Sequence, residues 1–172
     1  MHRTILPLML FAPVPLLPAM SLAQQTQVYR HPSLNIAFEA PENWRQVPRP
    51  EDELIYEVAD PDDAIHVVLW YTTTEQRAPD YLWKMASMKD LMVADRPAPT
   101  RIGHRDAWAL NVPGHERNGP VRMLLAVIPH GTSMERPKEN VLFIVMLWCP
   151  EEDYEQHRQR MQAILGSVRI AE

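Results

Sequence analysis

The sequence has few cysteines and glycines: one cysteine and five glycines among 172 residues. A single cysteine, Cys149, excludes an internal disulfide, so hydrophobic packing has to stabilise the fold even in an oxidising compartment. Five glycines provide no glycine-rich phosphate-binding loop, and neither a Gly-x-Ser-x-Gly nucleophile elbow nor a His-Glu-x-x-His zinc helix occurs. The sequence therefore gives no support to the common nucleotide-binding, hydrolase and metalloprotease functions.

A long uninterrupted apolar stretch is also missing. The apolar run near the N-terminus, residues 5–19, contains four prolines and is shorter than the roughly 20 residues that a membrane-spanning helix needs. It follows a basic start with Arg3 and precedes Ser21-Leu22-Ala23, a small-residue pattern typical of signal-peptidase sites. We therefore expect a signal peptide over residues 1–23, cleavage near Ala23, and a periplasmic or secreted mature chain without a membrane span.

Basic residues are outnumbered by acidic ones. The chain has 17 Lys and Arg against 22 Asp and Glu, a formal net charge of −5. Nucleic acids and anionic membranes attract basic surfaces, so neither is the expected partner. Residues 24–172 have the length of one ordinary domain and contain no internal repeat, so we expect a single domain there.

Apolar residues alternate with a period of two in several predicted strands. Residues 54–58 and 64–72 predict a hairpin across the turn-forming Asp60-Pro61. The second of these strands is mostly apolar on both faces, and residues 141–148 contain no polar side chain. A strand of this kind is covered on both sides, which indicates a sheet with a layer above and a layer below. Residues 140–149 are the expected central strand.

Two segments have the periodicity of amphipathic helices. The first opens at Pro79-Asp80, and its expected core stripe is Tyr81, Met85, Met88 and Met92, with Leu82 and Leu91 at its flanks. The second follows Pro150 and the acidic residues 151–153, and its expected buried stripe is Tyr154, Met161, Leu165 and Val168. Between the two helices, residues 100–128 predict a meander of three short strands. Its expected connections are a turn at residues 103–106 and a loop through Pro113-Gly114, with Asn118-Gly119 helping to close the second hairpin.

This order of elements resembles the PsbP-like family, whose fold is shared with the Ran-release factor and with exported bacterial proteins of the DcrB type. The resemblance rests on residues 34–44 (LNIAFEAPENW), the hairpin across Asp60-Pro61, Ile102-Gly103 followed by Ala107, and the closing residues 164–168. It implies an α+β fold, a three-layer α/β/α sandwich around a mainly antiparallel sheet. It implies no catalytic residue and no cofactor, because family members are mostly assembly, stabilising or binding modules.

The meander predicts one cluster of metal-ligating residue types. The turn at residues 103–106 and the loop expected at 129–139 emerge at the same end of an up-and-down sheet. They carry His104, Asp106, His130 and Glu135. Imidazole and carboxylate groups suit zinc or a similar ion, although solvated loop residues show the same pattern. None of the four has the spacing of a metal motif, so we expect added zinc to leave the melting temperature unchanged.

Other chemically notable residues have structural interpretations. Cys149 ends the most apolar strand, where an inert buried thiol is expected rather than a nucleophile activated by His157. His66 is expected to be a hydrogen-bonded histidine in the sheet, and His115 an exposed one at a hairpin tip. Trp83 lies off the first helix's apolar stripe beside a lysine, which makes it the candidate partner surface.

Three functions remain open from the sequence. The first is an exported noncatalytic binding or assembly module of the cell envelope that contacts another envelope protein. The second is a periplasmic small-ligand or metal-binding protein that uses the histidine-bearing loop rim. The third is a hydrolytic enzyme. A pocket at the histidines favours the second, and a flat surface with an exposed Trp83 favours the first.

Overall fold

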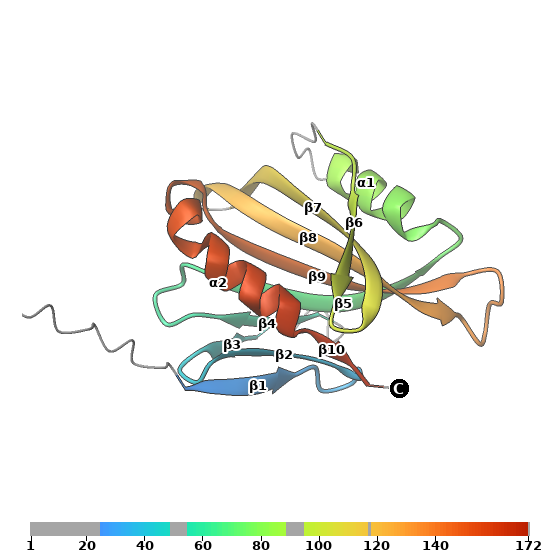
Figure 1. The fold of residues 1–172 in the computed structure, drawn as a ribbon, viewed down its shortest axis with the longest axis horizontal. Coiled ribbons are helices and arrows are strands. Elements are labelled where there is room, and N and C mark those ends of the chain that lie inside the picture. Colours follow the sequence, from blue (N-terminus) through green and yellow to red (C-terminus); the bar gives the residue numbers. More distant parts are fainter. Residues whose placement is uncertain (1–24, 49–54, 89–94, 117, 172) are drawn as a thin grey trace, which may run out of the picture.

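A seven-stranded antiparallel sheet forms the centre of the structure (Figure 1). The computed structural model describes residues 25–48, 55–88, 95–116 and 118–171, so the predicted signal peptide lies outside the described residues. The strands of the sheet follow the order β3-β4-β5-β9-β8-β7-β6. They are β3 (Arg45–Val47), β4 (Tyr56–Ala59), β5 (His66–Thr74), β6 (Ala98–Ile102), β7 (Arg105–Glu116), β8 (Gly119–Thr132) and β9 (Asn140–Pro150).

Strand β9 is the central strand of this sheet, as its apolar sequence predicts. It pairs with β5 on one side and with β8 on the other. Ile144 and Val145 point to opposite faces and neither is exposed. Both faces of the strand are therefore covered, which confirms the expectation of a layered sheet.

Helix α1 (Ala78–Met88) covers one face of the sheet over β7 and β8. Its fully or almost fully buried side chains are Ala78, Leu82 and Ala86, while Tyr81 and Met85 are only partly buried beside them. The predicted stripe was thus off by about one residue, because Leu82 occupies the centre of the contact. Of the rest of that stripe, the side chain of Met88 and all of residue 92 lie outside the described part. No helix among the described segments is long and apolar enough to cross a membrane.

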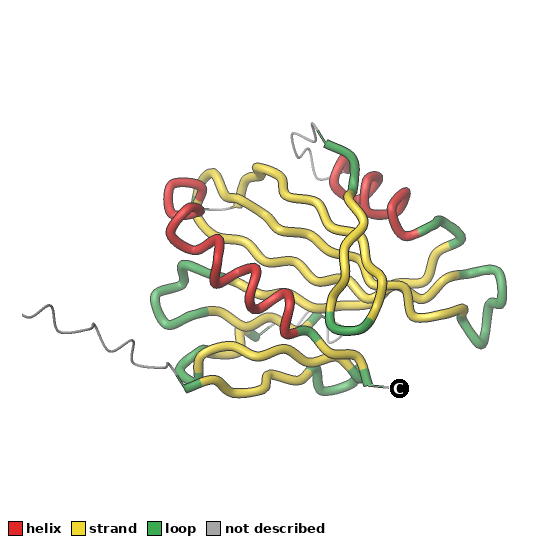
Figure 2. The backbone as a smooth tube through the Cα atoms, in the orientation of Figure 1, coloured by secondary structure: helices red, strands yellow, loops and turns green. Residues whose placement is uncertain are grey.

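The opposite face is covered by helix α2 (Tyr154–Ser167) together with a small three-stranded sheet (Figures 1 and 2). A short 3-10 helix, η1 (Glu151–Asp153), leads into α2. The small sheet has the order β1-β2-β10, made of β1 (Thr26–Arg30), β2 (Ile36–Pro41) and β10 (Arg169–Ile170). Phe38 of β2 and Met161 and Ile164 of α2 belong to one core cluster with the large sheet. The α+β class and the three layers are confirmed, with one outer layer that is part helix and part sheet.

The meander has longer strands than its sequence predicts. Strand β7 continues through Pro113-Gly114, where a loop was expected, and the chain turns at Asn118, one of the two residues expected to close this hairpin. Strand β6 pairs with β7 only as far as Ala109, so Pro113 lies where β7 has a neighbour on one side only. A proline is tolerated there because its missing N–H breaks no ladder bond. Strand β8 likewise extends to Thr132, so His130 lies in a strand and not in the loop where it was expected.

Candidate functional site

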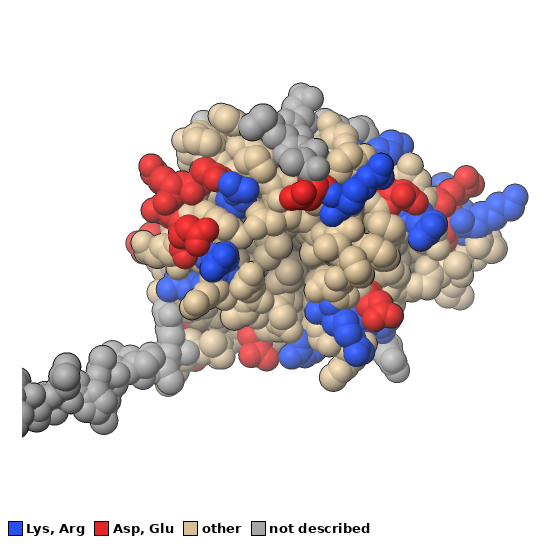
Figure 3. All heavy atoms as spheres, turned by 45° about the horizontal axis from the view of Figure 1, so that its top comes forward, with Lys and Arg blue, Asp and Glu red and all other residues tan. Residues whose placement is uncertain are grey.

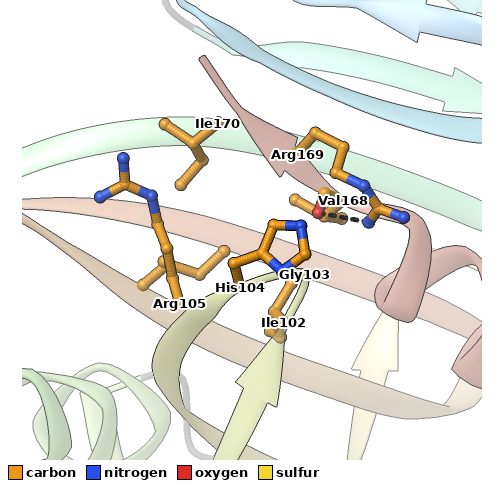
Figure 4. Close-up of a pocket in the computed structure, with 8 residues that line it drawn as sticks. Ile102, Gly103, His104, Arg105, Val168, Arg169 and Ile170 are labelled. Carbon is orange, nitrogen blue, oxygen red and sulfur yellow. Dashed lines mark hydrogen bonds between the residues drawn. The ribbon is translucent and has the colours of Figure 1, made fainter. Parts of the chain in front are cut away.

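A cavity of about 270 Å³ lies between the β6–β7 turn and the segment that follows α2 (Figure 4). The two segments are far apart in the sequence, and the long meander brings them together. The residues that line the cavity are Ile102, Gly103, His104, Arg105, Ile128, Val168, Arg169 and Ile170. We call this cavity the cationic pocket, since two of these residues are arginines, one is a histidine and none is acidic.

A glycine shapes the turn that forms one wall of the pocket. Gly103 has φ +59°, in the left-handed region that side chains other than glycine adopt at a cost. A β-carbon at this position would lie 3.0 Å from the carbonyl oxygen of Val168. The turn can therefore approach the segment after α2 only because residue 103 has no side chain.

The floor of the pocket is apolar and packed. Ile102, Ile128 and Val168 line the pocket and are at most 4% exposed. These three belong to the core cluster between the large sheet and α2. The floor is thus part of the rigid interior, while the charged groups stand around it.

Arg169 is fixed beside the C-terminus of α2. Its Nη1 donates to the carbonyl oxygens of Gly166 at 2.9 Å and Val168 at 3.0 Å; the second of these bonds is drawn in Figure 4. Basic groups are favoured at the end of a helix, where carbonyl groups lack helical partners. The acidic residues of η1 and the first turn of α2 gather at the other end, on the left in Figure 3. The helix therefore separates the acidic surface from the cationic pocket.

Arg105 is the second guanidinium at the pocket. Within the described chain it has neither an ion pair nor a side-chain hydrogen bond. In Figure 4, His104 projects between Arg105 on one side and Arg169 on the other. Among the described residues neither arginine has a carboxylate partner, although acidic residues outnumber basic ones in the chain. The arrangement leaves positive charge available to a ligand.

The pKa of His130 is lowered by burial and by the charge of Arg105. Its ring packs edge-on against Phe143 with the ring centroids 4.9 Å apart, and its buried Nδ1 has no hydrogen-bond partner in the described chain. Burial lowers the pKa of His130 below its ordinary value of 6.5, and the nearby charge of Arg105 lowers it further. His130 is therefore close enough to Arg105 to feel its charge, but it does not line the pocket.

The four predicted rim residues do not come together as a ligand set. Asp106 follows Arg105 in β7 and points to the opposite face, where it is 97% exposed and lies 3.9 Å from Arg101. His130 packs on the α2 side of the sheet, and Glu135 is exposed in the loop after β8. The described residues include no group of three His, Cys, Asp or Glu side chains that could hold a metal ion. Of the four, only His104 lines the pocket.

Two further predictions from the sequence are confirmed. Cys149 is fully buried, and burial, followed by the charges of Asp153 and Glu151, raises the pKa of its thiol to about 11. His66 is buried and hydrogen-bonded, with its Nδ1 2.7 Å from Oε1 of Glu57. Both groups are integrated in the sheet, not exposed as reactive groups.

Trp83 is less available than its position in the sequence predicts. The ring is partly buried, and the guanidinium carbon of Arg96 lies 4.8 Å from the ring centroid. The large hydrophobic side chains that are exposed in the described chain are Val28 and Met134 instead. The contact with Arg96 could not be foreseen, because it joins two segments on either side of a connection whose path the sequence does not specify.

A second cavity, of about 560 Å³, lies between the end of β5 and α1. Its lining includes Glu75 and Lys84, whose charges oppose each other, and the partly buried Tyr81 and Met85. The cationic pocket is the better candidate site because its charges are all of one sign.

Sequence reasoning missed Arg105 and Arg169. The only sequence signal for Arg105 was its place next to His104 in a glycine-containing turn. No sequence signal pointed to Arg169, because its position depends on the packing of the C-terminal segment against a turn 65 residues earlier.

Comparison with known proteins identifies the fold. No known protein-family model matches the sequence, and neither does any curated protein. The solution structure of cyanobacterial PsbP (CyanoP) from Synechocystis sp. PCC 6803 matches with a TM-score of 0.62 at 12% identity, over 93% of this chain and 100% of that one. LpqN of Mycobacterium tuberculosis, described as involved in cell envelope biogenesis, matches with a TM-score of 0.59 at 12% identity, over 86% of this chain and 91% of that one.

The likeness to these two structures shows the PsbP-like fold, as the sequence resemblance implies. The Ran-binding protein Mog1p of Saccharomyces cerevisiae also matches, with a TM-score of 0.49 at 8% identity, over 86% of this chain and 96% of that one, and we draw nothing from it. Fold alone does not fix activity, so function has to be argued from the pocket.

Proposed function

We propose that this chain is an exported noncatalytic binding or assembly module of the cell envelope and that the cationic pocket is its binding site. The observation that carries the proposal is that Arg105, which has no ion pair among the described residues, and Arg169 both line a pocket with a buried apolar floor. Such a floor with a few convergent polar groups is the usual form of a ligand site.

Export is supported by the N-terminal pattern of residues 1–23, with its basic start, apolar run and small residues before Gln24. The structural neighbour LpqN is described as involved in cell envelope biogenesis, which agrees with an envelope role. A noncatalytic role agrees with the states of Cys149 and His66, because the thiol is buried and strongly protonated and the imidazole is buried beside Glu57.

Capture from an envelope fraction tests the proposal. The purified chain and its variant Arg105→Gln/Arg169→Gln are immobilised, and bound proteins and small molecules are identified. The matched control is Arg158→Gln/Arg160→Gln, which removes the same charge from the exposed surface of α2. We expect at least one component that the wild type and the control retain and the pocket variant loses. Identical capture by all three chains would contradict the proposed site.

A small-ligand function is the second candidate, and one observation favours it. His104, which the sequence placed on the histidine-bearing rim, lines the pocket. If the component that depends on the pocket is a small molecule and no protein accompanies it, this second function replaces assembly with another protein.

A further inference from the structure

We propose that the cationic pocket binds a small organic anion that carries a carboxylate and a short branched apolar group. This specification of the ligand rests on the proposed binding function and names the chemistry that the pocket recognises.

The carboxylate is argued from the two guanidinium groups. Arg169 uses Nη1 for the carbonyl groups of Gly166 and Val168, so its Nε and Nη2 are left to donate to a ligand. Arg105 has all of its donors left among the described residues. A guanidinium fork matches the two oxygens of a carboxylate, and such charge-assisted bonds are the stronger kind.

The arginines are held ready for a ligand in different ways. The two backbone bonds fix Arg169 before any ligand arrives, so less side-chain entropy is lost on binding. Arg105 directly follows the Gly103-His104 turn, whose glycine contacts the backbone at Val168. The turn therefore sets the position from which Arg105 reaches the pocket.

The apolar part is argued from the floor. Ile102, Ile128 and Val168 are branched aliphatic side chains that are nearly completely buried, and Ile170 adds a partly buried fourth. The apolar surface that a ligand can remove from water comes mainly from Ile170, because the other three side chains are already almost completely buried. A branched aliphatic group suits a floor of this shape.

Size limits the ligand. The cavity of about 270 Å³ lies at the lower end of the roughly 300–1,000 Å³ that ligand pockets enclose. It has room for a short acid and none for a long chain, so we infer a small molecule.

Isothermal titration of the purified chain tests this inference with three organic probes of related shape and with inorganic phosphate. Isovalerate carries the carboxylate and a branched group, isovaleramide lacks the charge, and acetate lacks the branched group. We expect isovalerate to bind with 1:1 stoichiometry, and isovaleramide and acetate to bind about tenfold more weakly or not at all.

Variants locate the binding. Arg105→Gln and Arg169→Gln should each weaken isovalerate binding by about tenfold or more, whereas the exposed Arg160→Gln should leave it unchanged. Circular dichroism checks that each variant is folded, and Ile170→Ala gives a second readout that keeps both arginines. It should weaken isovalerate more than acetate.

Several results would overturn the inference: equal binding of isovalerate and isovaleramide, binding that neither arginine variant changes, or tighter binding of inorganic phosphate than of isovalerate. These outcomes are separable from failure of the proposed function. If isovalerate does not bind but the envelope fraction still yields a component that depends on the pocket, only the ligand class is rejected. Isovalerate binding without any pocket-dependent envelope component would reject the envelope role alone.

Discussion

At the residue scale, the turn glycine should be the least replaceable residue of the pocket. Gly103→Ala adds a β-carbon in the left-handed region and places it 3.0 Å from the carbonyl oxygen of Val168. We expect the free energy of unfolding, measured by urea denaturation, to fall by about 1–2 kcal/mol. Binding of isovalerate should also weaken, because the β6–β7 turn would have to move away from Val168.

Gly166→Ala is the matched control. Gly166 lies within α2, and a β-carbon there meets no atom within 4 Å. Because alanine is the better helix former, this variant should gain about 0.5–1 kcal/mol. Equal effects of the two substitutions would contradict the role given to the turn.

The thiol of Cys149 should react slowly. With its pKa raised to about 11, only about one molecule in ten thousand carries the thiolate at neutral pH, and the side chain is fully buried. We expect a thiol reagent such as Ellman's reagent to label the native chain over hours and the urea-unfolded chain within seconds to minutes. Rapid labelling of the native chain would reopen the nucleophile hypothesis.

His130 should contribute to acid sensitivity. Its pKa is lowered in the folded state, so below pH 6.5 the unfolded chain binds more protons at this site than the folded chain does. Stability is therefore lost as pH falls from about 6.5 to the folded-state pKa, and no further below it. In His130→Gln, urea denaturation between pH 7 and 5 should show a smaller loss. His115→Gln, at an exposed histidine on β7, is the control. An unchanged pH profile in His130→Gln would contradict the packing against Phe143.

At the scale of elements, the central strand should carry the most stability per side chain. Ile144→Ala removes a fully buried side chain from β9 and should lower the free energy of unfolding by about 2–5 kcal/mol. Val28→Ala changes a 59% exposed side chain on β1 and should stay within about 0.5 kcal/mol of the wild type. A small effect at Ile144 would mean that the face of β9 toward α1 is not covered.

The strands of the large sheet were predictable because periodicity and a two-sided apolar run report burial directly. Their ends were not, because they depend on neighbours. Pro113 interrupts the pattern locally but is accommodated where β6 no longer pairs with β7. The extension of β8 through His130 likewise depends on pairing with β9, and it moved that histidine out of the predicted rim.

At the scale of the whole molecule, the sequence predicted the layers better than the site. Two-sided strands and two amphipathic segments require a sheet between two layers, and the comparison with CyanoP and LpqN bears out the resulting fold. The pocket requires two segments 65 residues apart to approach so closely that a β-carbon at Gly103 would lie 3.0 Å from the carbonyl oxygen of Val168. Sequence periodicity does not specify that approach. The pocket's strongest feature is the charge of Arg105, which has no ion pair within the described part of the chain, and sequence periodicity gives no information on such pairing.

Charge is also arranged at this scale. The acidic residues of η1 and the first turn of α2 lie at one end of this helix, and Arg169 lies just beyond its other end. A local cationic pocket presents a favourable potential to an anion even in a protein of net charge −5. The molecule therefore combines a net negative charge with a pocket that a carboxylate can approach.

The most direct measurement is an NMR titration of the ¹⁵N-labelled chain with isovalerate. The account predicts that the largest amide shift changes occur at Gly103, His104 and Arg105 and along 168–170, that they saturate together, and that they disappear in Arg105→Gln/Arg169→Gln. The account would be contradicted if the shift changes centred on Tyr81 and Met85 in the second cavity, or if no shift change saturated with added isovalerate.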